Sequence, residues 1–286
     1  MRTIDLESLE IFRAVVQEGG VIRAAAKLNR VQSNVTTRIK QLEERLGLRL
    51  FRKQGRSLAL SPEGELLLSY AQRLFRLADE AESELKSGHA IGALRIGSLE
   101  STAGSRLAPI LSRYHKQHPA VVVELVTGTT GALIQRVINF EIEAAFVSEP
   151  FTAPGLNSVK VFEEELVLIT GRDVTGISRA SQLAGLTLIA FADGCSYRKR
   201  VQEWLGASAV MPARTLEFGS YQAMIACVAA STGFAIVPKS LLQSLKASSE
   251  VRQHELPARI RRNRTHLVWH GAPSSALQRL QVLLAG

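Results

Sequence analysis

The sequence predicts an α/β chain in which an N-terminal all-α domain and one long helix precede two Rossmann-like lobes. Three observations lead to this division. Apolar residues recur at three- and four-residue spacing up to about Ser87, strands and helices alternate from Ala93 onward, and a glycine-containing break at 88–92 separates the two patterns. A chain of 286 residues with 46% hydrophobic residues can also bury a sizeable core and form two or three domains.

A short alanine-rich helix and a second, amphipathic helix form the centre of the N-terminal part. Three consecutive alanines at 24–26 allow the second helix, at 31–43, to approach the first without leaving a void. The second helix turns an apolar stripe inward, made of Val35, Ile39, Leu42 and Leu46. Its outer side chains can exchange hydrogen bonds with base edges and phosphates, as a helix in a DNA major groove requires. These side chains are Gln32, Ser33, Thr36, Thr37 and Lys40.

A basic hairpin follows at once, which predicts a wing beside the second helix. Arg52, Lys53 and Arg56 surround a Gly turn, and 57–60 returns as a short alternating strand. The three cations can therefore reach phosphates or an adjacent minor groove.

The charge of the chain agrees with a polyanionic partner. Residues 1–60 hold 12 Lys and Arg residues but only 6 Asp and Glu residues, and the whole chain carries a net charge of +9. A solvated helical face beside an ordinary polar turn is the alternative for any one residue, whereas the ordered set favours double-stranded DNA. The candidate DNA contacts are Arg30, Gln32, Ser33, Thr36, Thr37, Arg38, Lys40, Arg52, Lys53 and Arg56.

A long helix is expected over 61–87, because Ser61 supplies an N-cap and Pro62 suits the first helical position. Apolar residues then follow the alternating four-three spacing of a coiled-coil seam. The seam residues are Leu67, Ala71, Leu74, Ala78, Ala81 and Leu85. This stripe predicts pairing of two chains, and an amphipathic helix packed on its own domain is the alternative. The break at 88–92 is the predicted hinge.

Strands and helices alternate in the C-terminal part, which predicts α/β architecture with a mostly parallel sheet. The expected strands span 94–99, 121–127, 144–147, 166–170, 186–191, 215–218, 234–237 and 265–269. The expected helices lie near 104–117, 131–139, 196–205 and 220–231. In such sheets a ligand binds beyond the carboxyl ends of the strands, where helix N-termini present unpaired N–H groups.

One motif extends through the first 64 residues. Its positions are Leu9, Phe12, Ala24, Ala25, Leu28, Gln32, Ser33, Arg38, Ile39, Leu42, Glu43, Leu46, Gly47, Leu50, Phe51, Leu60, Ser61 and Gly64. The motif resembles the signature of LysR-type transcriptional regulators, and the similarity covers the whole chain. Val31 and Ile22 stand where that family usually has Ser or Thr, so two hydroxyls that would cap helices are missing. The strings Gly97–Thr102 and Cys195–Arg198 more closely resemble members that control putrescine utilisation.

The resemblance implies a ligand-responsive, DNA-binding transcription regulator. It implies a winged helix-turn-helix domain at 1–60, a linker and dimerisation helix at 61–87, and an effector-binding domain at 93–286. The last would have a periplasmic-binding-protein-like fold whose lobes are joined by two crossover strands. Lobe I would cover about 93–163 plus 266–286, and lobe II about 164–265.

The expected partners follow from the same resemblance. The protein would form dimers and tetramers, read an operator with two half-sites, and contact RNA polymerase. It would control the pathway of a small metabolite, namely an amine, an amino acid or a carboxylate.

Polar and aromatic residues in the loops of both lobes are the candidate effector contacts. Hydroxyls beside helix N-termini could cradle a carboxylate, which predicts a small anionic effector, with Arg198 as a charge partner. Simple helix capping is the alternative for each hydroxyl taken alone. The resemblance implies that these residues converge on one cleft. They are Ser98, Ser101, Thr102, Thr127, Thr129, Thr130, Cys195, Ser196, Tyr197, Phe218 and Tyr221.

The sequence holds no constellation for catalysis. Gly92 and Gly97 do not complete a dinucleotide loop, no P-loop or nucleophile elbow occurs, and His115 and His118 lack companions for a metal. We therefore expect no enzyme, no cofactor and no metal. A solute receptor or small-molecule enzyme built on the same lobes would leave the first 87 residues unexplained.

Two distant cysteines, Cys195 and Cys227, form no disulfide framework, so a reducing cytoplasm is expected. No signal peptide or membrane span is expected, because no uninterrupted apolar run approaches the necessary length. A redox-responsive regulator that uses Cys195 is the alternative to metabolite sensing. Peroxide-sensing relatives carry a His-Cys pair after Asp-Gly, whereas Ser196 stands here at the reactive position.

Overall fold

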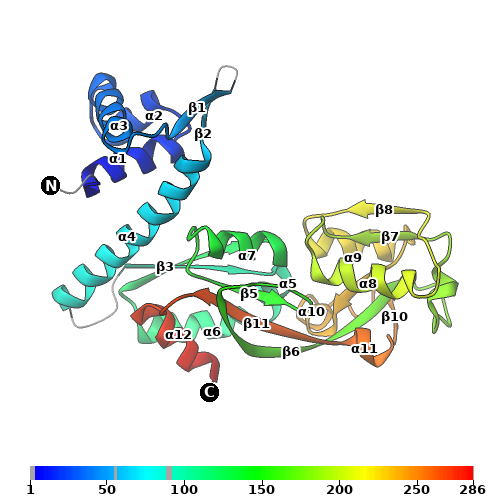
Figure 1. Cartoon of the computed structure of the whole chain (residues 1–286). Helices are drawn as coiled ribbons and strands as arrows, with labels where there is room; N and C mark the ends of the chain where they lie inside the picture. Colours follow the sequence, from blue (N-terminus) through cyan, green and yellow to red (C-terminus); the bar gives the residue numbers. More distant parts are fainter. Residues whose placement is uncertain (1–3, 55–56, 88–91, 286) are drawn as a thin grey trace. The chain divides into compact units, whose positions relative to one another are not determined.

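The computed structural model of the chain describes residues 4–54, 57–87 and 92–285. The chain divides into two compact units, Met1–Gly88 and His89–Gly286 (Figure 1). The predicted hinge at 88–92 lies outside the described residues apart from Gly92, which begins the first strand of the second unit. Among the described residues, no helix is both long enough and apolar enough to cross a membrane.

The N-terminal unit combines three helices, a two-stranded hairpin and a long fourth helix. Its elements are α1 (Leu6–Gln17), α2 (Val21–Lys27), α3 (Gln32–Leu46), β1 (Phe51–Gln54), β2 (Ser57–Leu60) and α4 (Pro62–Ser87). The apolar faces of the helices meet in one core, in which Ala24 and Val35 have no exposed surface. The predicted inward stripe of α3 is confirmed, because Ile39 and Leu42 are buried in the same core.

A buried carboxylate joins α3 to the hairpin. Glu43 accepts the backbone N–H of Leu50 at 2.7 Å, and Arg49 donates to its other oxygen at 3.1 Å. At the same end of the hairpin, where β2 leads into α4, the Ser61 hydroxyl donates to the Arg49 carbonyl at 2.6 Å and accepts the N–H of Gly64 at 2.9 Å. These hydrogen bonds give the polar groups at the base of the hairpin their partners, and they hold the hairpin between α3 and α4.

The long helix α4 divides its apolar residues between two faces. Leu67 and Ala71, which the sequence assigns to the dimer seam, are only 8% and 0% exposed and belong to the core of the N-terminal unit. That part of the seam prediction is wrong, because α1 and the hairpin need an apolar cover and the start of α4 supplies it. A neighbouring stripe remains on the outside. It consists of Leu66, Tyr70, Leu74, Leu77, Ala81 and Leu85.

The C-terminal unit contains two lobes. Lobe I holds β3 (Gly92–Ser98), β4 (Val121–Thr127), β5 (Ala144–Ser148), α5 (Glu100–Thr102), the π-helical turn η1 (Ala103–Leu107), α6 (Ala108–Gln117), α7 (Thr130–Ile138) and α12 (Ser275–Ala285). Lobe II holds η2 (Ala180–Leu183), β7 (Thr187–Ala190), α8 (Ser196–Gly206), β8 (Arg214–Glu217), α9 (Tyr221–Ala229), β9 (Ala235–Pro238), α10 (Lys239–Ser244), β10 (Arg252–His254) and α11 (Ala258–Arg261). Two strands, β6 (Leu156–Thr170) and β11 (Arg262–His270), join the lobes (Figure 1).

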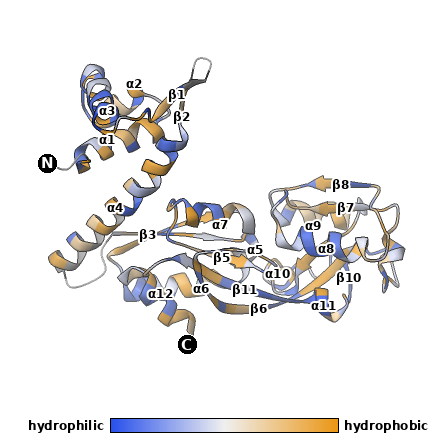
Figure 2. Cartoon of the chain, viewed as in Figure 1, coloured by the Kyte–Doolittle hydropathy of each residue, from blue (hydrophilic) through white to orange (hydrophobic). Residues whose placement is uncertain are grey.

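Helices cover both faces of the lobe I sheet (Figure 1). Side chains of a strand alternate between the two faces, and β5 is apolar on both. Ala144 and Phe146 lie in the core beneath α6 and α12, whereas Ala145 and Val147 lie in the core beneath α7. Figure 2 shows the contrast between apolar strands and the hydrophilic outer side of helices such as α8.

The sheet is mixed, which corrects the expectation of a mostly parallel one. Strand β3 pairs in parallel with β4 and β5, and β7 pairs in parallel with β8. Around the joining strands all pairs are antiparallel: β11 with β5 and β6, and β6 with β9 and β10. Because β6 and β11 pass directly between the lobes, no crossover helix makes them parallel to their neighbours.

The structure contains elements that the sequence pattern does not predict. Strand β6 begins at Leu156, whereas the sequence predicts a strand only from 166. The pattern misses the first half of β6 because this half is largely exposed and lacks a buried apolar run. Strand β10 and helices α10 and α11 are too short to show a clear period. Helix α12 is also unpredicted, although Ser274 caps it by accepting the N–H of Leu277 at 3.1 Å.

Gly233 tests how tightly lobe II is packed. A Cβ at Gly233 would overlap the carbonyl oxygen of Thr187, which accepts the N–H of Phe234 at 2.9 Å. We expect Gly233→Ala to lower the free energy of unfolding of the C-terminal unit by about 1 to 3 kcal/mol. Urea titration followed through the fluorescence of buried Trp204 measures the change. In the control, Gly206→Ala, the new Cβ meets nothing within 4 Å, and an equal loss there would contradict the packing argument.

Candidate DNA-binding surface and effector pocket

The outer face of α3 is polar. Four of the predicted DNA contacts on it are exposed, namely Gln32, Ser33, Thr37 and Lys40. Thr36 is half-buried, and its hydroxyl donates to the carbonyl of Gln32 at 3.0 Å. Val31, which precedes the helix, is 68% exposed and makes no capping hydrogen bond. The first turn of α3 therefore has no side-chain cap, so its N–H groups can meet a phosphate.

Two predicted DNA contacts are held by one carboxylate of α1. Glu7 accepts from Arg30 through Oε1 at 2.8 Å and from Arg38 through Oε2 at 3.1 Å. Arg38 comes five residues after Ser33, so it projects about 140° away from Ser33 around the helix. Both arginines thus link α1 to the region of α3, and the carboxylate neutralises part of the charge that they would offer to DNA.

The hairpin carries the predicted wing. Arg52 is exposed on β1 and Lys53 lies beside it in the same strand, whereas Arg56 falls outside the described residues. The sequence pattern does not single out Arg49, which lies just before β1. Its side chain is 83% exposed even though it pairs with Glu43, so it adds a cation at the base of the wing.

The predicted effector residues at the end of β3 are buried. Ser98, Ser101 and Thr102 are each no more than 3% exposed, and Tyr197 of α8 is buried as well. Burial raises the pKa of Tyr197, and the nearby Ser101 hydroxyl opposes that rise. Neither hydroxyl has a hydrogen bond of regular geometry within the part of the chain that the structure describes. Two buried polar groups therefore lie together beneath the contact between the lobes.

The second predicted loop meets the first turn of α8. Thr129 caps α7, and the hydroxyls of Thr130 and Ser196 approach each other to 3.4 Å across the lobes. Beside them, the N–H of Gly131 donates to the carbonyl of Gly194 at 3.2 Å. The start of α7 in lobe I and the start of α8 in lobe II are therefore in direct contact.

Two predicted residues, Thr127 and Phe218, lie away from this contact, whereas Tyr221 lies beside Ser101, Tyr197 and Cys195. Thr127 is exposed at the end of β4, and Phe218 packs against the core of lobe II. The ring of Tyr221 is 4% exposed and lies 4.7 Å from that of Phe191. The N–H of Tyr221 donates to both carboxylate oxygens of Glu100, at 3.2 and 3.1 Å, so a lobe I side chain caps α9 of lobe II.

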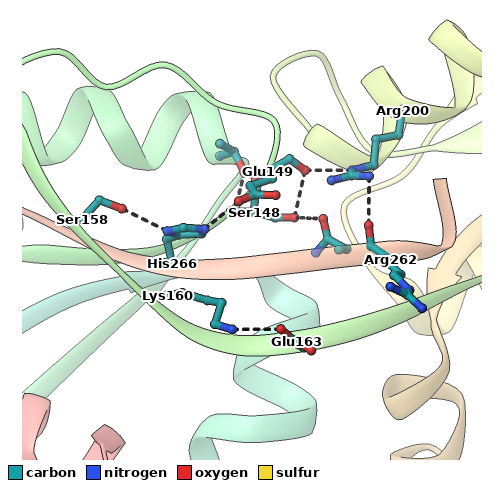
Figure 3. Close-up of polar contacts among 10 residues, drawn as sticks. Ser148, Glu149, Ser158, Lys160, Glu163, Arg200, Arg262 and His266 are labelled. Atoms are coloured by element: carbon teal, nitrogen blue, oxygen red, sulfur yellow. Dashed lines mark hydrogen bonds and ion pairs between the residues drawn. The ribbon is translucent and has the colours of Figure 1, made fainter. Parts of the chain in front are cut away.

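Arg200 is another polar link between the lobes (Figure 3). It donates to the carbonyl of Glu149 at 3.0 Å and to those of Arg259 and Arg262 at 3.3 and 3.2 Å. Burial lowers the pKa of Arg200. The carboxylate of Glu149 in turn lies 2.8 Å from Nε2 of His266 on β11. Helix α8 is thereby connected to lobe I and to a strand that joins the lobes.

An open pocket of about 390 Å³ lies between α7, the loop after β5 and the first half of α8. Three of its lining residues are predicted effector contacts: Thr130, Cys195 and Ser196. Among the lining residues that the sequence does not predict are Ile134, Phe151, Lys199 and Gln202. A signal for one of them was present in the sequence, because Lys199 follows Ser196 by three residues and so lies next to it on the helix surface.

The thiol of Cys195 lines this pocket without being activated. Burial raises the pKa of Cys195, and the backbone N–H groups of Arg198 and Tyr197 only partly oppose the rise. A thiol with a raised pKa stays protonated at neutral pH, whereas reaction with an oxidant needs the thiolate. Cys227 packs against the core of lobe II. These surroundings do not favour the redox alternative.

The histidines near the end of α6 have ordinary structural surroundings. His115 is exposed, while the ring of His118 lies 5.0 Å from that of Tyr114 and its Nδ1 lies 3.3 Å from Arg279. Among the residues that the structure describes, no three His, Cys, Asp or Glu side chains gather as metal ligands would.

A helix-turn-helix unit with a wing, followed by two lobes around a pocket, defines a DNA-binding regulator with an effector domain. Residues 6–65 match the family model "Bacterial regulatory helix-turn-helix protein, lysR family", and residues 87–284 match "LysR substrate binding domain". The chain belongs to the LysR family of transcriptional regulators.

Curated relatives agree with this assignment over most of the chain. The HTH-type transcriptional regulator GltR of Bacillus subtilis (strain 168) is 36% identical over 254 residues, which cover 88% of this chain and 86% of GltR. The regulator SoxR of Arthrobacter sp. (strain TE1826) is 37% identical over 255 residues, covering 89% and 86%. The crystal structure of full-length CbnR with its target DNA has the same fold, with a TM-score of 0.69 at 20% identity over 99% of both chains. The protein is accordingly a regulator and not an enzyme.

Glu7 offers a test of how much charge the N-terminal unit presents to DNA. Glu7→Gln removes the carboxylate that holds Arg30 and Arg38, so both guanidinium groups become free to reach phosphates. We expect tighter binding to any duplex, with a slope of log K against log salt that is steeper by about 0.9 to 1.8. Fluorescence anisotropy between about 50 and 200 mM salt measures this slope.

The matched control is Glu10→Gln. Glu10 is exposed on the same helix, and the structure shows no ion pair for it within the described residues. This variant removes the same charge without releasing an arginine. Equal slopes for the two variants would show that the ion pairs of Glu7 do not limit DNA binding.

Proposed function

We propose that this LysR-family regulator binds an operator with two half-sites as a dimer and responds to a small anionic metabolite held between its lobes. The exposed polar face of α3 beside a cationic hairpin carries the DNA-binding part of the proposal. In a major groove, Gln32, Ser33 and Thr37 would face base edges, and Arg52 and Lys53 would face phosphates. Because the protein would act on DNA, we propose that it works in the cytoplasm.

Dimerisation through α4 is supported by its uncovered apolar stripe. The side chains of Leu66, Tyr70, Leu74, Leu77 and Leu85 are between 42% and 87% exposed. Together with Ala81 they fall within about 100° of the helix surface. A second copy of the helix would cover such a stripe, and the two copies of α3 would then reach two half-sites. Tetramer formation and contact with RNA polymerase remain predictions from the family resemblance.

The effector is proposed to bind in the pocket between α7 and α8. Because both lobes line this pocket, a bound metabolite would favour one arrangement of the lobes over others. We propose regulation of an amine, amino acid or carboxylate pathway. Of these pathways, putrescine utilisation has the least support, because Lys199 lines the pocket and would repel a diamine.

Two substitutions separate base readout from phosphate attraction. Gln32→Ala should lose about 1 to 3 kcal/mol of discrimination at one base position, because an amide contact to a base edge is removed. Arg52→Ala should weaken binding to all sequences and flatten the salt dependence, because phosphate contacts carry no sequence information. An operator found by sequencing the DNA fragments that the protein retains, and its single-base variants, serve for the titrations. Opposite behaviour of the two variants would contradict the assignment.

The exposed stripe of α4 can be tested at Leu77, which is 62% exposed. Leu77→Asp should split dimers, with a rise of more than about tenfold in the dimer Kd, because an apolar contact becomes an unpaired carboxylate. Light scattering measures the oligomer, and gel shifts measure binding to an operator with two half-sites. Met211→Asp is the control, since Met211 is 79% exposed in lobe II. An unchanged dimer in Leu77→Asp would mean that α4 does not form the interface.

A further inference from the structure

Two cations, Arg198 and Lys199, and one carboxylate, Asp193, line the pocket between the lobes. Arg198 is already engaged, because it pairs with Asp193 at 3.1 Å and with Glu217 at 2.6 Å and also donates to the carbonyl of Phe191. Lys199 is exposed, lines the same pocket, and has no ion pair within the described part of the chain. Lys199 is therefore the cation that a ligand entering this pocket would meet.

The lobe I side of the pocket has an apolar wall beside the polar residues Thr130, Gln135 and Thr152. This wall is formed by Ile134 on α7 and by Pro150 and Phe151 after β5. Ile134 belongs to a core of lobe I, and the ring of Phe151 packs edge-on against His266 with 5.4 Å between the ring centres. Both side chains thus have firm support. A ligand in the pocket would touch an apolar wall on one lobe and a cation on the other.

We propose that the pocket selects a monocarboxylate with an apolar body, and that Lys199 and Phe151 are its recognition residues. This proposal rests on the effector response proposed above and names the class of effector. The volume of about 390 Å³ lies in the range of small-molecule sites. An inorganic oxyanion would leave the apolar wall uncovered, and a diamine would bring a second positive charge beside Lys199.

The floor of the pocket suits a carboxylate as well. Thr130 and Ser196 are both buried, and their hydroxyls lie 3.4 Å apart. The Thr130 hydroxyl also makes long contacts with Ser148, donating to its carbonyl at 3.4 Å and accepting its N–H at 3.3 Å. A hydroxyl can rotate its proton toward a new acceptor, so both can donate to a carboxylate oxygen. The same ligand would then strengthen the nearby contact between Gly131 and Gly194 and favour the closed arrangement of the lobes.

Four probes separate the charge from the apolar body. Calorimetric titration of the full-length protein should show binding of hexanoate or benzoate and no binding of hexylamine. Acetate should bind at least about tenfold more weakly than hexanoate, because it lacks the apolar chain. Lys199→Gln should weaken hexanoate binding about tenfold, while Lys116→Gln, which removes an exposed lysine of α6 outside the pocket, should leave it unchanged. Phe151→Ala should weaken hexanoate and leave acetate unchanged.

Several results would overturn the proposal. Equal binding of acetate and hexanoate, binding of hexylamine, or an equal effect of Lys199→Gln and Lys116→Gln would each do so. Operator binding by the same protein gives an independent readout. If neither hexanoate nor benzoate binds while operator binding is intact, the proposed ligand class is wrong, but the proposed function as a DNA-binding regulator is not contradicted. If hexanoate binds without changing operator binding, the pocket assignment is supported and its role as effector site fails.

Discussion

The antiparallel pairing of β6 with β11 is the constraint on which the C-terminal unit depends. The two strands pair along the whole of β11, from Arg262 opposite Glu165 to His270 opposite Leu156, with one irregularity after Thr265. Strand β11 also pairs with β5 of lobe I, and β6 also pairs with β9 and β10 of lobe II. The same backbone hydrogen bonds therefore hold both sheets and bring the N-terminus of α7 to that of α8.

The contacts that close the lobes over this frame depend largely on backbone groups. Gly131 donates to the carbonyl of Gly194, and a Cβ at Gly194, where φ is +87°, would meet Oγ1 of Thr129 at 3.0 Å. Arg200 binds a carbonyl of lobe I, and Glu100 binds the N–H of α9. Because none of these links is part of an apolar core, a ligand that binds beside them can favour one arrangement of the lobes without disturbing the packing of either lobe.

Two carboxylates have different roles in the N-terminal unit. Glu43 is buried and holds the hairpin, whereas Glu7 is 43% exposed and pairs with Arg30 and Arg38. A buried carboxylate with several donors mainly stabilises the fold, but an exposed ion pair can be exchanged for a phosphate at little cost. A count of basic residues therefore overstates the charge that is immediately available to DNA.

Local periodicity was enough to predict the inward stripe of α3, the parallel units of lobe I and helix α8, because each depends on residues close together in the sequence. Tertiary structure alone decided that Leu67 belongs to the N-terminal core, that β6 and β11 are antiparallel, and that Glu7 holds Arg38, 31 residues away. It also decided that Ile134 and Lys199 line one pocket. Strand direction, charge partners and pocket walls are set by how distant elements pack, and no local spacing records that packing.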